Sequence, residues 1–175
     1  QVLDVKPTDL SQVVTTARSL FQRALGERNR LEIRLPDEPT VVLVDATQIE
    51  QSILNMLVNA RHAMPNGGRV TLEVTRTQLQ DDAEWPGAQP GSYVRLCVSD
   101  DGAGMDADVL RRKAVEKGMM DAEQAARMTP QECYNLIFLP GFSTKAQISD
   151  ISGRGVGMDV VRTKIGSLNG TVEID

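Results

Sequence analysis

The sequence predicts an α/β fold for this chain of 175 residues. Two long segments carry apolar residues at the three- and four-residue spacing of helices that bury one face. Other, shorter segments alternate apolar and polar residues, as half-buried strands do. Glycines and prolines separate these segments and mark turns. The length suits one domain, or one domain with a small appendage.

The first half of the chain is expected to contain two helices and four strands. Thr8 or Asp9 can cap the first helix, and Pro65-Asn66-Gly67-Gly68 ends the second. The last two strands should pair antiparallel. In chain order the elements are a helix over 8–27, strands over 31–35 and 41–44, a helix over 46–64, a strand over 69–76, a polar loop over 77–91 and a strand over 92–99.

Beyond Asp100 the pattern changes to short helical segments and polar loops. The loop over 139–154 is rich in small and polar residues, so we expect it to be mobile. The expected elements are helices over about 106–117, 121–127 and 130–137, this loop, a helix over 156–168 that begins at glycines, and a strand from Gly170 to Asp175.

Composition and charge exclude several kinds of site and partner. A net charge of −5 argues against nucleic-acid binding but not against a bound nucleotide, which backbone N–H groups can hold. Cys97 and Cys133 are predicted to be small buried side chains in a reducing compartment. His62 is the single histidine, which excludes a site of two imidazoles. Without an apolar run of membrane-spanning length, we expect a cytoplasmic domain with no membrane contact.

Two asparagines on the helix over 46–64 are the first candidates for a functional site. Asn55 and Asn59 are four residues apart and so share a face of that helix. Amide oxygens at this spacing can reach Mg²⁺ or orient a water molecule. A capping or solvated role is the alternative for each asparagine considered alone.

Two glycine-containing segments are the other candidates. Asp100-Asp101-Gly102-Ala103-Gly104 follows a strand, and its glycines let the backbone approach a flat ligand closely. Gly153-Arg154-Gly155-Val156-Gly157 precedes a helix, where exposed N–H groups and the helix dipole favour phosphate. This second segment is not a Walker A loop, because no Gly-Lys-Ser/Thr follows it, and it does not follow a strand as a dinucleotide fingerprint would. An ordinary loop and a flexible linker remain the alternatives for the two segments taken singly.

Taken in order, these features resemble the nucleotide site of the GHKL ATPases, which include histidine kinases, DNA gyrase, a heat-shock chaperone and mismatch-repair ATPases. The resemblance extends from about residue 8 to 175, and four boxes in the right order are a specific signal. The boxes are IEQSILNMLVNA at 49–60 (N box), DDGAGM at 100–105 (G1), FLPGFST at 138–144 (F) and GRGVGMDVV at 153–161 (G2).

Within that superfamily the resemblance divides near the G1 box. Residues 1–105 are most similar to hybrid sensor histidine kinases, and residues 106–175 to the chemotaxis kinases. A natural kinase of mixed ancestry and an engineered chimera both fit this pattern. The resemblance implies a two-layer α/β sandwich of the GHKL (Bergerat) type, with helices on one face of a mixed, largely antiparallel sheet. Residues 1–175 would form one ATP-binding catalytic domain.

The resemblance also implies a role for each residue of the boxes. Asn59 would ligate Mg²⁺, and Asn55 would lie close to the γ-phosphate of ATP. Asp100 would bind the adenine amine, with Gly102 and Gly104 shaping its pocket. The other implied ATP-contacting residues are His62, which could also be an ordinary surface histidine, and Phe142, Ser143, Thr144, Gly153, Arg154, Gly155, Val156, Gly157 and Met158, with an ATP lid over about 141–154.

The implied reaction transfers the γ-phosphoryl group of ATP to a histidine on a separate phosphoacceptor domain, which in turn serves a response regulator. These residues contain no phosphoacceptor helix, because the single histidine, His62, lies on the helix that carries the N box. An ATP-driven conformational switch is one alternative, although such relatives carry a glutamate where this chain has Asn55. A nucleotide-binding module without catalysis is the other.

Overall fold

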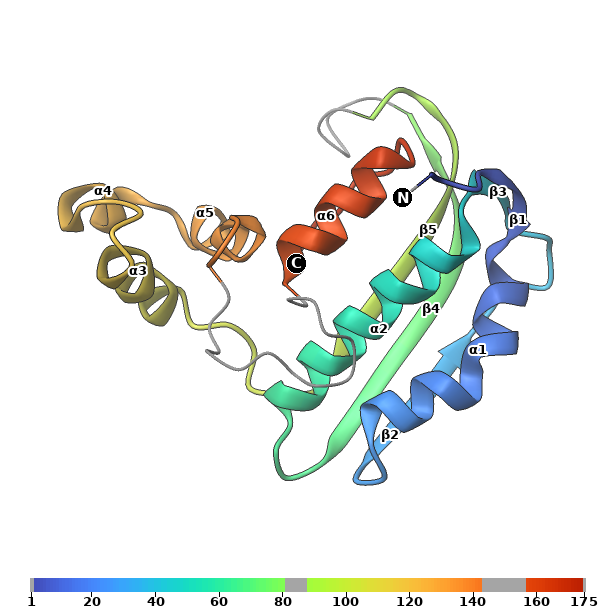
Figure 1. Ribbon diagram of the computed structural model, residues 1–175, viewed down its shortest axis with the longest axis horizontal. Helices are drawn as coiled ribbons and strands as arrows, with labels where there is room; N and C mark the ends of the chain where they lie inside the picture. Colours follow the sequence, from blue (N-terminus) through green and yellow to red (C-terminus); the bar gives the residue numbers. More distant parts are fainter. Residues whose placement is uncertain (1, 81–87, 143–156, 175) are drawn as a thin grey trace. The chain divides into compact units, whose positions relative to one another are not determined.

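The computed structural model describes residues 2–80, 88–142 and 157–174. The chain divides into two compact units, Gln1–Ala103 and Gly104–Asp175, which are described separately (Figure 1). The predicted α/β fold with a mixed sheet is confirmed. None of the helices among the described residues is long and apolar enough to span a membrane.

The first unit contains a three-stranded sheet in the order β2-β4-β5. These strands are β2 (Asn29–Arg34), β4 (Gly68–Leu79) and β5 (Gly91–Asp100). Strands β2 and β4 are parallel, whereas β4 and β5 pair antiparallel, as predicted. A separate antiparallel pair joins β1 (Lys6–Asp9) to β3 (Val41–Val44).

Two helices, α1 (Leu10–Leu25) and α2 (Ala46–Ala63), pack together over one face of the three-stranded sheet (Figure 1). The predicted cap of α1 is confirmed at Asp9, whose side chain accepts from Ser11 N. Asp45 caps α2 in the same way. The buried core between helices and sheet is formed mainly by Val14, Phe21, Leu25, Ile53, Leu57, Val70, Leu72 and Val74.

Asp9 and Thr40 form a hydrogen-bonded clamp that joins the start of α1 to the segment before β3. Thr40 is fully buried, and its hydroxyl donates to Asp9 Oδ1 at 2.7 Å. The same hydroxyl oxygen accepts from Ser11 N at 2.9 Å. Chiefly because of the Thr40 hydroxyl, the pKa of Asp9 lies below its ordinary value. The ionised carboxylate therefore stabilises the folded state.

Thr40→Val is expected to reduce the free energy of unfolding by about 1–2 kcal/mol at neutral pH, because it removes a buried hydroxyl and its hydrogen bonds. A lowered pKa gives stability that is complete above the unfolded value, near 3.9, and is lost as pH falls through the folded value. The difference between the two proteins should therefore shrink as the pH falls below about 4. Urea unfolding across a pH series measures this, and a difference that stays constant with pH would contradict the clamp.

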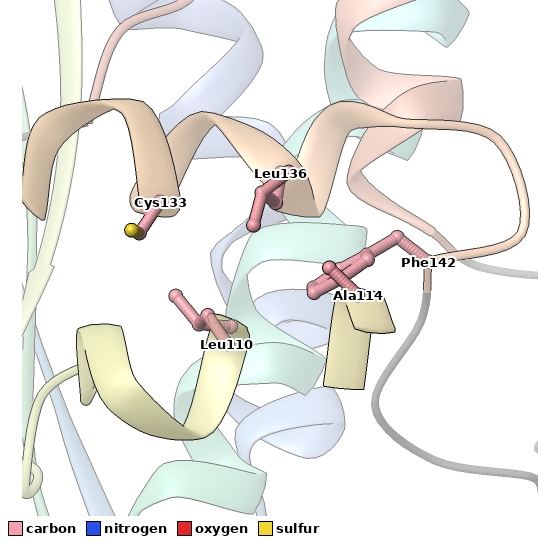
Figure 2. Packing of buried hydrophobic residues seen from close by; sticks show 5 residues of the cluster. All are labelled: Leu110, Ala114, Cys133, Leu136 and Phe142. Atoms are coloured by element: carbon pink, nitrogen blue, oxygen red, sulfur yellow. The ribbon is translucent and has the colours of Figure 1, made fainter. Parts of the chain in front are cut away.

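The second unit consists of short helices that cover a small apolar cluster. Its elements are α3 (Ala107–Glu116), α4 (Ala122–Arg127), α5 (Pro130–Asn135), the 3₁₀ turn η1 (Leu136–Phe138) and α6 (Met158–Ser167). Capping boxes begin α4 at Asp121 and α5 at Thr129. Figure 2 shows the cluster of Leu110, Ala114, Cys133, Leu136 and Phe142.

One predicted element is wrong in the described part of the chain. The strand expected from Gly170 is absent over residues 170–174. A strand exists only through backbone hydrogen bonds to a neighbouring strand. Here the Ile174 carbonyl instead accepts from the Gln131 side chain at 2.8 Å. Alternation of apolar and polar residues predicts a strand only where a neighbouring strand can pair with the segment.

Two glycines of the second unit give opposite predictions for the same substitution. Gly166, in the last turn of α6, has open space around an added Cβ, so Gly166→Ala should raise stability by about 0.5–1 kcal/mol. Gly118 also has open space, but its φ of +68° at the end of α3 favours glycine. Gly118→Ala should therefore cost about 1–2 kcal/mol. Amide hydrogen exchange in the second unit measures the stability change of each variant. Equal changes in the two variants would contradict the different roles given to the two glycines.

Candidate functional site

Helix α2 carries both predicted asparagines, and the structure gives them different environments. Asn55 is only 2% exposed, and its Oδ1 accepts a hydrogen bond from Gln51 Nε2 at 3.2 Å. Asn59, one turn further along, is exposed. Helical spacing therefore places both amides on one side of α2, but only Asn59 presents its side chain to solvent.

The buried polar residues of α2 were not anticipated from the sequence. Gln48 and Ser52 are also buried, and the Ser52 hydroxyl donates to the Gln48 carbonyl at 2.8 Å. With Asn55 and Asn59 they follow the spacing of four, three and four residues that forms one line along a helix. This polar line could have been found by extending the asparagine argument toward the N-terminus of the helix.

The turn after β5 lies against the end of α2. Asp100 is exposed, and its Oδ1 accepts from Gly102 N at 2.9 Å. A Cβ at Gly102 would lie 2.7 Å from Asp100 Oδ1 and 3.0 Å from the Ala63 carbonyl oxygen. A side chain at this position would therefore displace the Asp100 carboxylate and press tightly on the Ala63 backbone, which glycine avoids.

This contact brings two of the predicted site features together within the first unit. Ala63 follows Asn59 by four residues and therefore lies on the same side of α2. Since Gly102 packs against Ala63, the exposed Asp100 carboxylate and the exposed Asn59 amide belong to one region of the surface. His62, which precedes Ala63, is exposed as well.

The remaining predicted residues fall in the second unit or outside the described residues. Gly104 has a φ of +73° and open space around it. Gly157 precedes α6 without a side-chain cap, and Met158 is the first residue of that helix. Phe142 is completely buried in the cluster of Figure 2. Ser143, Thr144, Gly153, Arg154, Gly155 and Val156 lie outside the described residues, as does most of the expected lid over 141–154.

The described residues contain no group of three or more His, Cys, Asp or Glu side chains that could hold a metal ion. Mg²⁺ needs no such group, because it usually keeps several waters and takes one or two protein oxygens beside the phosphates of its ligand. The Asn59 amide oxygen suits that mode of binding.

Comparison with known proteins identifies the family. Residues 44–175 match the family described as histidine kinase-, DNA gyrase B- and HSP90-like ATPase. The chain belongs to this family. Both features of the first unit, the amides of α2 and the turn at Asp100, lie within the matched residues of this ATPase domain.

Individual relatives carry histidine kinase and chemotaxis names. The sensor histidine kinase CheAY of Helicobacter pylori is 52% identical over 85 residues, 49% of this chain and 11% of that protein. The chemotaxis protein CheA of Bacillus subtilis is 31% identical over 179 residues, 98% of this chain and 27% of that protein. The chain thus spans a small part of these relatives, and the likeness to chemotaxis proteins extends over residues 1–105 as well as 106–175.

A solved structure supports the fold of the ATPase domain. The catalytic domain of histidine kinase ThkA matches with a TM-score of 0.58 and 18% sequence identity, over 94% of this chain and 82% of that one. At this identity the match establishes the fold class that the sequence predicted, an α/β domain of the histidine kinase catalytic type.

Proposed function

We propose that residues 1–175 form the Mg²⁺–ATP-binding catalytic domain of a histidine kinase of the chemotaxis or two-component type. Its reaction is transfer of the γ-phosphoryl group of ATP to a histidine on a separate phosphoacceptor domain, with a response regulator as the next partner. The observation that carries the proposal is the packing of Gly102 against Ala63, which places an exposed carboxylate beside the amide-bearing end of α2.

Asp100 is the proposed adenine-binding residue. Its Oδ1 is occupied by Gly102 N, and none of the described residues hydrogen-bonds to its Oδ2. A carboxylate oxygen accepts hydrogen bonds only, which suits the exocyclic amine of adenine. Gly102 leaves no side chain in the way, so a flat ring can approach the backbone closely.

Asn59 is the proposed metal ligand and Asn55 its buried neighbour. Mg²⁺, when bound with ATP, would supply positive charge that offsets the charge of the phosphates. Asn59 would hold that ion through its amide oxygen. The Gln51 side chain holds the Asn55 amide through a hydrogen bond. Because Asn55 is a neutral amide, the chain has no carboxylate at this position to activate a water molecule. Phosphoryl transfer is therefore favoured over hydrolysis.

The glycine-rich segment before α6 is the proposed phosphate-binding element. Helix N-termini favour anions because their first N–H groups are unpaired and the helix dipole is positive there. Gly157 and Met158 begin α6 without a side-chain cap, which leaves such donors available. His62 on α2 is a further proposed ATP contact, as are Ser143, Thr144 and residues 153–156, which lie outside the described residues, and Phe142 stands at the beginning of the proposed lid.

Two measurements on the 175-residue chain test this function. Calorimetric titration should show binding of an ATP analogue that strengthens with Mg²⁺, and a hundredfold excess over Kd should stabilise the fold by about 2.7 kcal/mol. With a phosphoacceptor domain from a chemotaxis kinase supplied separately, labelled phosphate should appear on that domain. Phosphate release without transfer would instead indicate an ATP-driven switch, and binding without either product would indicate a module without catalysis.

A further inference from the structure

We propose that Asp101 is the positioning residue of the nucleotide-binding turn, acting through its carboxylate oxygen rather than through its charge. This inference rests on the proposed function, because it concerns how Asp100 is held for adenine. Sequence reasoning assigned a role to Asp100 and to Gly102 but none to the residue between them.

The hydrogen bonds of Asp101 show how the turn begins. The pairing of β4 with β5 ends with Val70 opposite Asp100, so the next pair in register is Arg69 with Asp101. The Asp101 N–H donates to the Arg69 carbonyl at 3.2 Å, as in a regular antiparallel pair. The return bond differs, because the Arg69 N–H donates to Asp101 Oδ1 at 2.7 Å.

The side chain of Asp101 thus replaces its own main-chain carbonyl in the ladder. A hydrogen-bonded antiparallel pair normally exchanges two backbone bonds. Because the carboxylate supplies the second acceptor, the main-chain carbonyl of Asp101 is not needed for pairing with β4. The backbone after Asp101 therefore does not have to continue as a strand. The chain can then turn toward Ala63, where Gly102 packs.

Two neighbouring residues lie close to this carboxylate, although Asp101 as a whole is exposed. A Cβ added at Gly68 would collide with Asp101 Oδ1 and with the Met64 thioether. Met64 is the C-terminal cap of α2 and is only 4% exposed. The carboxylate oxygen therefore lies near Met64, at the end of α2, and near the start of β4, and one added methylene would move it away from the Arg69 N–H.

The test compares four substitutions in the 175-residue chain by calorimetric titration with an ATP analogue and with the matching GTP analogue. Asp101→Asn keeps an oxygen acceptor in place without the charge, whereas Asp101→Glu keeps the charge but displaces the oxygen. Asp101→Ala removes both. Asp37→Ala is the matched control, since Asp37 is exposed and makes no hydrogen bond or ion pair within the described residues.

Asp101→Ala and Asp101→Glu should each weaken ATP binding by about five- to tenfold, the effect of one lost hydrogen bond, and should reduce the preference for ATP over GTP. Asp101→Asn and Asp37→Ala should stay within about twofold of the unaltered chain, since each keeps the acceptor. A general loss of packing would not change the preference between the two bases.

Three results would overturn the inference. In the first, Asp101→Ala and Asp101→Glu both bind ATP like the unaltered chain. In the second, Asp101→Asn binds weakly while Asp101→Glu binds normally, and the role of Asp101 would then depend on its charge. If the alanine variant does not fold, the Asn and Glu pair decides the question without it. Absence of ATP binding by the unaltered chain would contradict the proposed function itself, and the inference with it.

Discussion

Asp100→Ala is expected to weaken ATP binding by about 10- to 100-fold, because a hydrogen bond to a charged group contributes about 1.5–3 kcal/mol. It should also abolish the preference for adenine over guanine, whose corresponding ring position carries a carbonyl that a carboxylate cannot bind. Calorimetric titration with ATP and GTP analogues measures both effects. The Asp37→Ala variant, which removes an exposed carboxylate elsewhere, should retain full affinity and preference.

Asn59→Ala is expected to fail in a different way. Losing a metal ligand should remove the gain in affinity that Mg²⁺ provides, while binding measured in the presence of a chelator should persist. Adenine preference should also remain, because Asp100 is untouched. The same titrations with and without Mg²⁺ separate the two variants. Indistinguishable defects in Asp100→Ala and Asn59→Ala would count against the separate roles proposed for a base contact and a metal contact.

The features that the sequence predicted well are set by local chemistry. The strand Val41–Val44 and the helix after Asp45 have the expected bounds to within one residue. Apolar spacing and a capping aspartate act within a few residues of chain, so they can be identified without knowledge of the rest of the fold. The antiparallel pairing of β4 and β5 followed in the same way from two alternating segments that neighbour each other in the chain.

The features that the sequence did not predict depend on contacts between distant segments. The burial of Asn55 and the exposure of Asn59 differ although both are asparagines on one helix, because the surroundings of α2 decide which amide meets solvent. Asp101 hydrogen-bonds to a residue 32 positions away in the chain. Its acceptor role becomes visible only when the register of β4 and β5 is known.

Phe142 shows where resemblance and structure emphasise different roles for one residue. Its box suggested contact with ATP, yet the side chain is completely buried against Leu110, Ala114, Cys133 and Leu136 (Figure 2). The turn that leads to it is closed by two backbone hydrogen bonds, from Leu139 N to the Leu136 carbonyl and from Phe142 N to the Leu139 carbonyl, each at 3.0 Å. The residue therefore anchors the end of this turn to the helices of the second unit.

Phe142→Ala is accordingly expected to destabilise the second unit by about 3–5 kcal/mol, the usual cost of emptying a buried phenylalanine site. Hydrogen exchange of the amides in α3 and α5 is the suitable measurement, since it reports this unit alone even if the two units unfold separately. Leu139→Ala is the matched control in the same turn. Leu139 is 42% exposed, so its loss should cost less than about 1 kcal/mol. If Phe142→Ala left hydrogen exchange unchanged but weakened ATP binding, Phe142 would be an ATP-contacting residue, as its box implies, and not a core residue of the second unit.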